Sequence, residues 1–401
     1  MVTSENSQDN DVSLTMDPDV VLDVQDLKTN FYTYEGVVKA LDGVTVQLRR
    51  GETLAFVGET GCGKSVTAKS ILRLVDAPGK IEHGKVLFED DDEEGNRVVK
   101  DILQISEDEM RAIRGNKVGI VFQDPATYPN PVFRIGDQIA EVISLHQDLA
   151  AESLEMNIIE LETALGKNPS SDSAAEIKEK IEYYKAQRDN PPPPSSKDRK
   201  KAAMSLAIEM LRMVRMPSPE SVAQQYPHEL SGGMRQRALI GMALACNPKI
   251  LICDEATTAL DVTVQAQVLK ILNDLKKELG SSIIIITHDL GVVAETCTWV
   301  AVMYAGVVVE YASTDEIFND PIHPYTQGLL RAIPKITEKV DRLLQIKGTV
   351  PNLITPPTGC RFHPRCEFAT EICSQQRPPR EEIKPGHWIE CYHPQSLKDT
   401  R

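Results

Sequence analysis

The segment GETGCGKS, residues 58–65, constrains the fold of this chain most strongly. It follows the apolar run TLAFV and precedes a helical pattern, SVTAKSILRLV, so it fits G-x-x-x-x-G-K-[ST] between a strand and a helix. Glycines let such a loop curl until its N–H groups point at phosphate oxygens, and the helix N-terminus adds a favourable dipole. The sequence therefore predicts a phosphate-binding loop that closes around a nucleotide.

Two side chains of the loop are expected to contact the phosphates or the metal ion that accompanies them. Lys64 is expected to neutralise the β- and γ-phosphates, and Ser65 to ligate Mg²⁺. The full set of expected contacts is Gly58, Glu59, Thr60, Gly61, Cys62, Gly63, Lys64, Ser65 and Val66.

Short apolar runs alternate with helical patterns over residues 51–300. KVGIVFQDP, KILICDEAT and SSIIIITHD each have strand length, and the last two are rich in β-branched residues. Buried strands that alternate with helices indicate an α/β fold with a parallel or mixed sheet. Before residue 51, alternating patterns such as VVLDVQDLKTNFYTY predict further strands.

The run ILICDE, residues 250–255, ends a predicted strand with two carboxylates. Asp254 is placed to hold Mg²⁺ through water. Glu255 is placed to polarise the attacking water as a general base.

The segment LSGGMRQR, residues 230–237, resembles the signature motif of ATP-binding-cassette (ABC) ATPases. In that family this turn acts in trans, on the ATP that the partner subunit holds, and Ser231, Gly232 and Gly233 match it. The resemblance implies an ABC-type nucleotide-binding domain, a mixed sheet plus a helical subdomain, with ATP and Mg²⁺ as cofactors.

Other family motifs follow in order. Gln123 in VFQDP matches the loop that contacts Mg²⁺ and the transmembrane subunit. Asp261 closes the ALD of the D-loop, and His288 in IITHD matches the switch histidine that contacts the γ-phosphate. The family also stacks an aromatic side chain on adenine; Tyr34 is the preferred candidate, with Tyr32 and Phe31 as alternatives.

The net charge and the hydropathy of the chain limit the classes of partner that it can have. The chain has 44 basic and 59 acidic residues, a net charge of −15, which argues against nucleic acid as the main partner. No apolar run reaches 18 residues, so no span of a membrane is predicted, and the polar start lacks the regions of a secretory signal.

Three long phrases resemble one branch of the family, the dipeptide, oligopeptide and nickel uptake ATPases. They are QDPATYPNPVFRIGDQI, FNDPIHPYTQGLLRAIP and GTVPNLITPPTGCRFHPRCEFATEIC. The resemblance implies an importer in which a solute-binding protein delivers substrate to two permease subunits. It also implies a second, homologous ATPase chain and a peripheral location on the cytoplasmic face of the membrane.

Peptides are the preferred solute, with oligosaccharides and nickel as alternatives. An alternative of another class is a non-transport ABC ATPase that acts on nucleic acid or the ribosome. A catalytically dead subunit is disfavoured, because Lys64, Glu255 and His288 are all present.

Four of the eight cysteines gather near the end of the sequence, at Cys360, Cys366, Cys373 and Cys391. Four thiolates can hold Zn²⁺ or an iron–sulfur cluster, and a metal would stabilise a loop-rich segment with little core. The resemblance favours a [4Fe–4S] cluster, with Zn²⁺, disulfides or free thiols as alternatives.

The expected organisation has three consecutive parts, and the second contains an insertion. Residues 1–19 form a disordered tail, residues 20–320 the ATPase domain, and residues 321–401 a cysteine-containing extension. Within the ATPase domain, residues 150–200 are expected to form a helical hairpin with a proline-rich joint; the alternative is a solvated, partly helical insertion.

Overall fold

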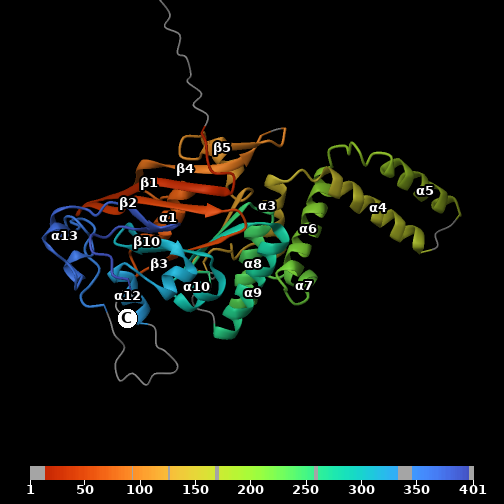
Figure 1. Ribbon diagram of the computed structural model, residues 1–401. Helices are drawn as coiled ribbons and strands as arrows, with labels where there is room; N and C mark the ends of the chain where they lie inside the picture. The colour runs from red at the N-terminus through yellow and green to blue at the C-terminus, as the bar shows by residue number, and fades with distance from the viewer. Residues whose placement is uncertain are drawn as a thin grey trace, which may run out of the picture. The chain divides into compact units, whose positions relative to one another are not determined.

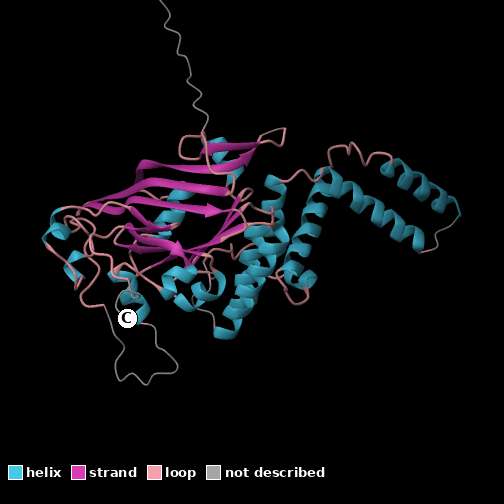
Figure 2. Ribbon diagram, in the orientation of Figure 1, coloured by secondary structure: helices cyan, strands magenta, loops and turns pink. Residues whose placement is uncertain are grey.

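The structure is a computed structural model of the chain. It describes residues 14–92, 94–124, 127–167, 171–256, 261–332 and 346–396. The chain divides into two compact units. Unit 1 comprises residues 1–110 and 287–401, and unit 2 comprises residues 111–286; each combines strands with helices, as Figures 1 and 2 show.

Unit 1 contains an antiparallel sheet in the order β2-β1-β4-β5. Its two longest strands pair from Val20 with Arg49 to Thr33 with Gly36, and several bulges interrupt the register. Many apolar residues of these strands are buried, Leu22, Val24 and Leu27 among them. The bounds are β1 (Val20–Thr33), β2 (Gly36–Arg49), β4 (Gly79–Asp91) and β5 (Arg97–Asp101).

The other strands of unit 1 make a mixed sheet, in the order β11-β12-β10-β9-β3. β3 pairs with β9 in parallel, and β9 pairs with β10 in antiparallel fashion. Every residue of β3 is buried, as its unbroken apolar sequence predicts. The bounds are β3 (Thr53–Val57), β9 (Trp299–Tyr304), β10 (Val307–Ser313), β11 (Glu381–Lys384) and β12 (His387–Ile389).

Short helices complete unit 1. They are α1 (Lys64–Ile71), α10 (Leu290–Thr296), α11 (Thr314–Asn319), α12 (Pro324–Arg331), η2 (His363–Arg365) and α13 (Glu371–Gln375). Helix α2 (Glu107–Ile113) spans the division between the units.

Unit 2 is built on the parallel strands β6 (Val118–Val121), β7 (Ile250–Asp254) and β8 (Ser282–Ile286). All residues of β7 and β8 are buried, and β-branched isoleucines dominate β8. Outside residues 150–185, the longer helices of the unit are α3 (Ile135–His146), α6 (Ser196–Met213), α8 (Gly232–Leu244) and α9 (Val262–Leu279). The short helices α7 (Pro219–Ala223) and η1 (Pro227–Glu229) lie between α6 and α8 in the sequence.

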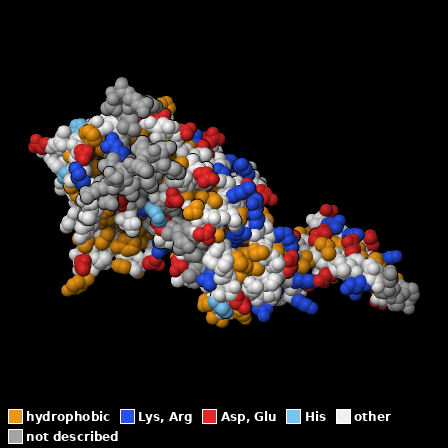
Figure 3. Space-filling view, turned by 90° about the horizontal axis from the view of Figure 1, so that it is seen from below, with side chains coloured by type: hydrophobic (Ala, Val, Ile, Leu, Met, Phe, Trp, Pro, Cys, Tyr) orange, Lys and Arg blue, Asp and Glu red, His pale blue; other side chains and the backbone are white. Residues whose placement is uncertain are grey.

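Two helices occupy the segment where a hairpin was expected. Helices α4 (Ala150–Gly166) and α5 (Ser171–Lys185) share a small core of Leu154, Ile158 and Ile181. Lys/Arg and Asp/Glu side chains alternate over their surface (Figure 3), and ion pairs such as Lys185–Glu162 at 2.9 Å join them. Such exposed pairs contribute little, so the apolar seam holds the hairpin together.

Most of the expected N-terminal tail lies outside the described residues. In its described part, the carbonyl of Asp17 accepts a hydrogen bond from Arg97 at 2.9 Å. Among the described residues, no helix is both long and apolar enough to cross a bilayer.

Candidate functional site

The phosphate-loop sequence adopts a glycine-dependent turn between β3 and α1. Gly58, Gly61 and Gly63 all have positive φ, at 147°, 80° and 104°. A Cβ at Gly63 would lie 2.8 Å from Leu41 Cδ2 and 2.9 Å from the Ala40 carbonyl, so this position admits glycine alone. The backbone thus takes the conformation that the motif predicts, at the start of a helix.

Lys64 lies over this loop. Its side chain is buried, and Nζ donates hydrogen bonds to the carbonyls of Gly58 at 2.8 Å and Glu59 at 3.1 Å. Burial raises the pKa of the neighbouring Cys62 thiol, although Lys64 opposes the shift, so Cys62 is a neutral packing group. The ammonium group is therefore the cation of the loop.

His288 lies beside the phosphate loop in the same unit. Val57, Gly58, Glu59 and Thr60 line a pocket together with His288, Leu290 and Leu329. The structure therefore brings together two motifs that are 224 residues apart (288 − 64) in the sequence.

In unit 2, the carboxylates of Asp254 and Glu255 lie at the end of a buried strand, as the sequence predicts. Asp254 ends β7 and is 5% exposed, and Glu255 follows with a left-handed φ of 47°. Gln123 Nε2 donates a hydrogen bond to Glu255 Oε2 at 2.5 Å. Gln123 and Glu255, which were identified from two different motifs, are thus in direct contact. The Gln123 amide fixes the orientation of the Glu255 carboxylate.

The signature turn forms the N-terminus of α8. Ser231 caps the helix by accepting a bond from the Met234 N–H at 3.4 Å, and Ser231 and Gly232 are exposed. A Cβ on Gly233 would lie 2.7 Å from Val264 Cγ1, so α8 and α9 approach closely here. Asp261 caps α9 by accepting a bond from the N–H of the same Val264 at 2.9 Å. Ala259 and Leu260 of the D-loop lie outside the described residues.

The adenine candidates lie at the β1–β2 turn of unit 1. The Tyr34 side chain is fully exposed at the tip of the turn, whereas the Tyr32 hydroxyl donates to Glu82 at 2.9 Å. Tyr34 is thus the more available of the two for stacking.

Sequence reasoning missed two residues that contact the phosphate loop. The Tyr325 hydroxyl accepts a hydrogen bond from the Glu59 N–H at 2.9 Å, and Arg365 forms two bonds to the Glu59 carboxylate. Both belong to phrases that suggested the importer branch, HPYTQ and HPRC, but neither phrase has a spacing that points to the loop.

The prediction of a metal-binding cysteine cluster is wrong. Within the described residues, which include all four terminal cysteines, no group of three or more His, Cys, Asp or Glu side chains is arranged to hold a metal ion. Burial raises the pKa of Cys360 to about 11 and that of Cys391 to about 12. The arrangement of the side chains supports neither the predicted [4Fe–4S] cluster nor its Zn²⁺ alternative. None of the cysteines forms a disulfide.

Arginines and aromatic rings hold the extension in place instead. Arg361 pairs with Asp42 at 2.9 Å, and Arg377 pairs with Glu390 at 2.9 Å. Phe362 is buried against Tyr304 and Tyr325, with ring centroids 5.1 and 5.3 Å apart. These contacts supply the stabilisation that the spacing of the cysteines suggested a metal would provide.

The buried His323 gives unit 1 a predictable pH dependence. Desolvation lowers its pKa from 6.5 to about 4, and its Nδ1 accepts the Tyr325 N–H at 3.0 Å. The folded protein binds the proton less well than the unfolded chain, so stability is present above pH 6.5 and is lost as the pH falls towards 4. We expect His323→Asn, which keeps a capping acceptor, to remove about 3 kcal/mol of this dependence.

Denaturant unfolding of both proteins at pH 7 and pH 4 measures the difference. The buried His387–Glu310 pair, at 2.8 Å, is common to both proteins and cancels in the comparison. An equal loss of stability on acidification in both proteins would contradict the assignment.

Comparison with known proteins agrees with this geometry. A family model described as "ABC transporter" matches residues 41–258, and one described as "Oligopeptide/dipeptide transporter, C-terminal region" matches residues 309–373. The chain therefore belongs to the ABC transporter family of ATP-binding proteins and carries the C-terminal region of its oligopeptide/dipeptide branch.

The relatives cover almost the whole chain. The probable peptide ABC transporter ATP-binding protein y4tR of Sinorhizobium fredii is 44% identical over 377 residues, 93% of this chain and 95% of the relative. The oligopeptide transport ATP-binding protein OppD of Bacillus subtilis is 42% identical over 94% of this chain and 90% of its own length. The dipeptide transport ATP-binding protein DppD of Lactococcus lactis is 41% identical over 93% and 90%.

Among solved structures, the dimeric bacterial ABC transporter cassette MJ0796 has the same fold. The TM-score is 0.52 at 22% identity, over 73% of this chain and 98% of that chain. The α/β cassette fold predicted from the sequence is confirmed.

Proposed function

We propose that this chain is the ATP-hydrolysing subunit of an importer that takes up peptides. The observation that carries the proposal is the match of residues 309–373 to the oligopeptide/dipeptide C-terminal region, behind an ABC cassette. Relatives named for oligopeptide and dipeptide transport support the same class of solute. Oligosaccharides and nickel remain the alternatives to be tested.

Each residue of the candidate site has a separate role in the binding or hydrolysis of ATP. Lys64 and the loop N–H groups bind the β- and γ-phosphates, and Tyr34 stacks on adenine. Ser65 and Gln123 would be the oxygen ligands of a bound Mg²⁺, and Asp254 would hold it through water; the ion would supply neutralisation of phosphate charge. Glu255 accepts the proton of the attacking water, and the Gln123 amide at 2.5 Å keeps its carboxylate oriented. His288 contacts the γ-phosphate.

The exposed signature turn supports action on a second subunit. Ser231, Gly232 and Asp261 are exposed at two helix N-termini, where backbone N–H groups favour phosphate. We place there the ATP of a partner ATPase, a homologous and different chain. The complex also contains two permease subunits and an extracellular solute-binding protein, and the chain acts peripherally on the cytoplasmic face of the membrane.

The proposed organisation keeps an ATPase domain at residues 20–320 and an extension at residues 321–401, after an N-terminal tail at residues 1–19. The α4–α5 hairpin is an insertion in the ATPase domain. Its composition, with alternating charges outside and a small apolar seam inside, supports a surface element rather than part of the nucleotide site.

Transport by the reconstituted complex tests the proposal. The permeases and second ATPase that co-purify with this chain are assembled with it in proteoliposomes, with ATP on the ATPase side. Uptake of labelled dipeptides, maltooligosaccharides and Ni²⁺ is compared in the presence of the binding protein. Peptide uptake that requires ATP supports the proposal. Uptake of sugar or nickel alone, or co-purification with ribosomes or DNA instead of permeases, would contradict it.

A further inference from the structure

The phosphate loop contains an acid, Glu59, directly after its first glycine. A carboxylate in a loop that binds triphosphate opposes the binding of its ligand, because like charges repel strongly at short range and low dielectric. A loop of this sequence therefore depends on a counter-charge from elsewhere in the fold.

Arg365 supplies that charge through a bidentate salt bridge to Glu59. Its Nη1 lies 2.6 Å from Glu59 Oε2, and its Nη2 lies 3.0 Å from Glu59 Oε1. The Arg365 side chain is 5% exposed, against 30% for Glu59, so solvent screens the pair weakly. Bidentate guanidinium–carboxylate pairs are among the strongest and most directional polar contacts in proteins.

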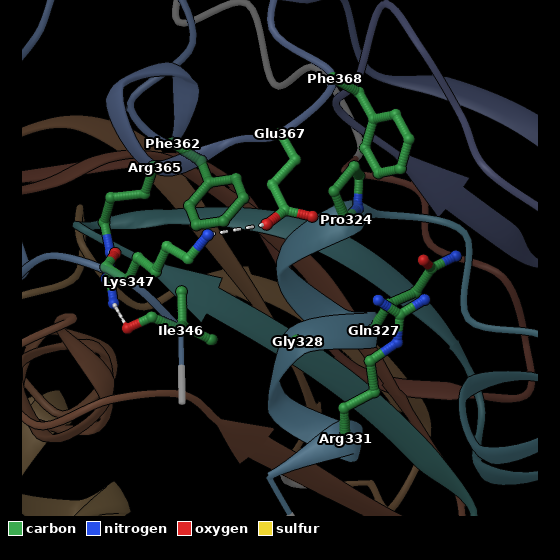
Figure 4. A pocket seen from close by; sticks show the side chains of 10 residues that line it. All are labelled: Pro324, Gln327, Gly328, Arg331, Ile346, Lys347, Phe362, Arg365, Glu367 and Phe368. Carbon is green, nitrogen blue, oxygen red and sulfur yellow. Dashed lines mark hydrogen bonds and ion pairs between the residues drawn. The ribbon is translucent and has the colours of Figure 1, made fainter. Parts of the chain in front are cut away.

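The surroundings fix the guanidinium in position. Arg365 Nε donates to the Lys347 carbonyl at 2.8 Å, and Nη2 to the Ile346 carbonyl at 3.3 Å. The group also lies 5.6 Å from the centroid of the Tyr304 ring and 6.0 Å from that of Phe362. Figure 4 shows Arg365 beside Phe362, with its bond to Ile346, while the neighbouring Lys347 pairs with Glu367. Hydrogen bonding to Glu59 raises the pKa of Arg365, which stays charged.

A second contact reaches the same loop residue. The Tyr325 hydroxyl accepts the Glu59 N–H at 2.9 Å, and its buried ring packs on Tyr304 and Phe362. Glu59 is thus held at its backbone by α12 and at its carboxylate by η2, both of them from the C-terminal part of the chain.

We propose that Arg365 is a positioning residue of the ATP site, which neutralises Glu59 and so makes the nucleotide affinity of the phosphate loop depend on the C-terminal extension. This proposal rests on the proposed ATPase function. It assigns to the extension a role in the site that lies more than 300 residues upstream, at a sequence separation of 306.

A charge-compensation cycle tests the proposal. The Kd for a fluorescent ATP analogue and the KM and kcat for ATP are measured in the assembled complex for four variants: Arg365→Gln, Arg365→Lys, Glu59→Gln and the double variant Arg365→Gln/Glu59→Gln. We expect Arg365→Gln to weaken binding roughly 10-fold, because it leaves the Glu59 charge uncompensated. The effect falls on Kd and KM, with kcat within about 2-fold of wild type, because Arg365 touches no reacting atom.

The double variant distinguishes neutralisation of Glu59 from a packing role of Arg365. Removing the Glu59 charge is expected to restore the affinity lost in Arg365→Gln, to within about 3-fold of Glu59→Gln alone. Arg365→Lys keeps the charge without the fork and is expected to fall between wild type and Arg365→Gln. A double variant as weak as Arg365→Gln would mean that Arg365 acts only by packing, and would overturn the proposal.

Arg377→Gln is the matched control. Arg377 belongs to the same extension but pairs with Glu390 and with the Asp42 carbonyl. We expect a lower melting temperature with unchanged Kd for the analogue. Loss of affinity equal to that of Arg365→Gln would attribute both effects to general loosening of the extension. Failure of the wild-type complex to bind the analogue would refute the proposed ATPase function itself, whereas equal affinity in all variants would refute only the role of Arg365.

Discussion

Replacing Glu255 by Gln is expected to lower the kcat for ATP hydrolysis in the assembled complex by about 10²- to 10⁴-fold, the usual contribution of a general base. Binding of ATP should stay close to wild type, because the phosphate loop and Lys64 are unchanged. The neutral amide has the shape of the carboxylate but cannot take the proton of the attacking water. The result is a protein that traps ATP and does not turn it over.

Phosphate release and the fraction of bound, unhydrolysed ATP measure this effect together. Glu278→Gln, at an exposed position late in α9, makes the same chemical change away from the site and should hydrolyse ATP at the wild-type rate. A normal kcat for Glu255→Gln would refute the role of Glu255 as the base.

Replacing Lys64 by Met is expected to weaken ATP binding roughly 10- to 100-fold. Hydrogen bonds to a charged group are typically worth about 1.5–3 kcal/mol, and each 1.4 kcal/mol is tenfold in affinity. In the structure Lys64 Nζ is bonded to two loop carbonyls, so the ammonium is already held in the phosphate loop. Methionine is one atom shorter than lysine; it keeps an unbranched apolar side chain and removes the charge and the donors.

Titration of a fluorescent ATP analogue gives the affinity, and a melting curve checks the fold. Lys69→Met is the comparison, since Lys69 belongs to the same helix and pairs with the exposed Asp76 at 2.9 Å. That variant should bind the analogue as the wild type does. Equal affinity of the Lys64 and wild-type proteins would show that the loop binds the phosphates without this cation.

The features of the candidate site that can be predicted from the sequence are those in which a few adjacent residues determine the local chain geometry. The glycines of the phosphate loop need positive φ, and the two carboxylates close a buried strand; both requirements are visible in a few adjacent residues. The caps formed by Ser231 and Asp261 are equally local.

Contacts between distant segments could not be predicted in the same way. The Gln123–Glu255 bond joins residues 132 apart, and the Arg365–Glu59 pair joins residues 306 apart. One arginine among many carries no local mark of its partner. The cysteines led to the opposite error. They lie close together in the sequence, which suggested that they bind one metal centre, but in the folded chain they are not arranged to do so.

The pairing of β12 with β10, Glu310 opposite Ile389 and Tyr311 opposite Trp388, has a consequence for the solubility of shortened chains. Without residues 381–389 the N–H and C=O groups of β10 on that side would lose their partners, along a strand whose side chains are almost all buried. An uncovered apolar strand edge is a template for pairing with other chains, and edges of this kind promote aggregation. The extension is therefore also a cover for the sheet, and a truncated cassette that ends after α12 is expected to self-associate.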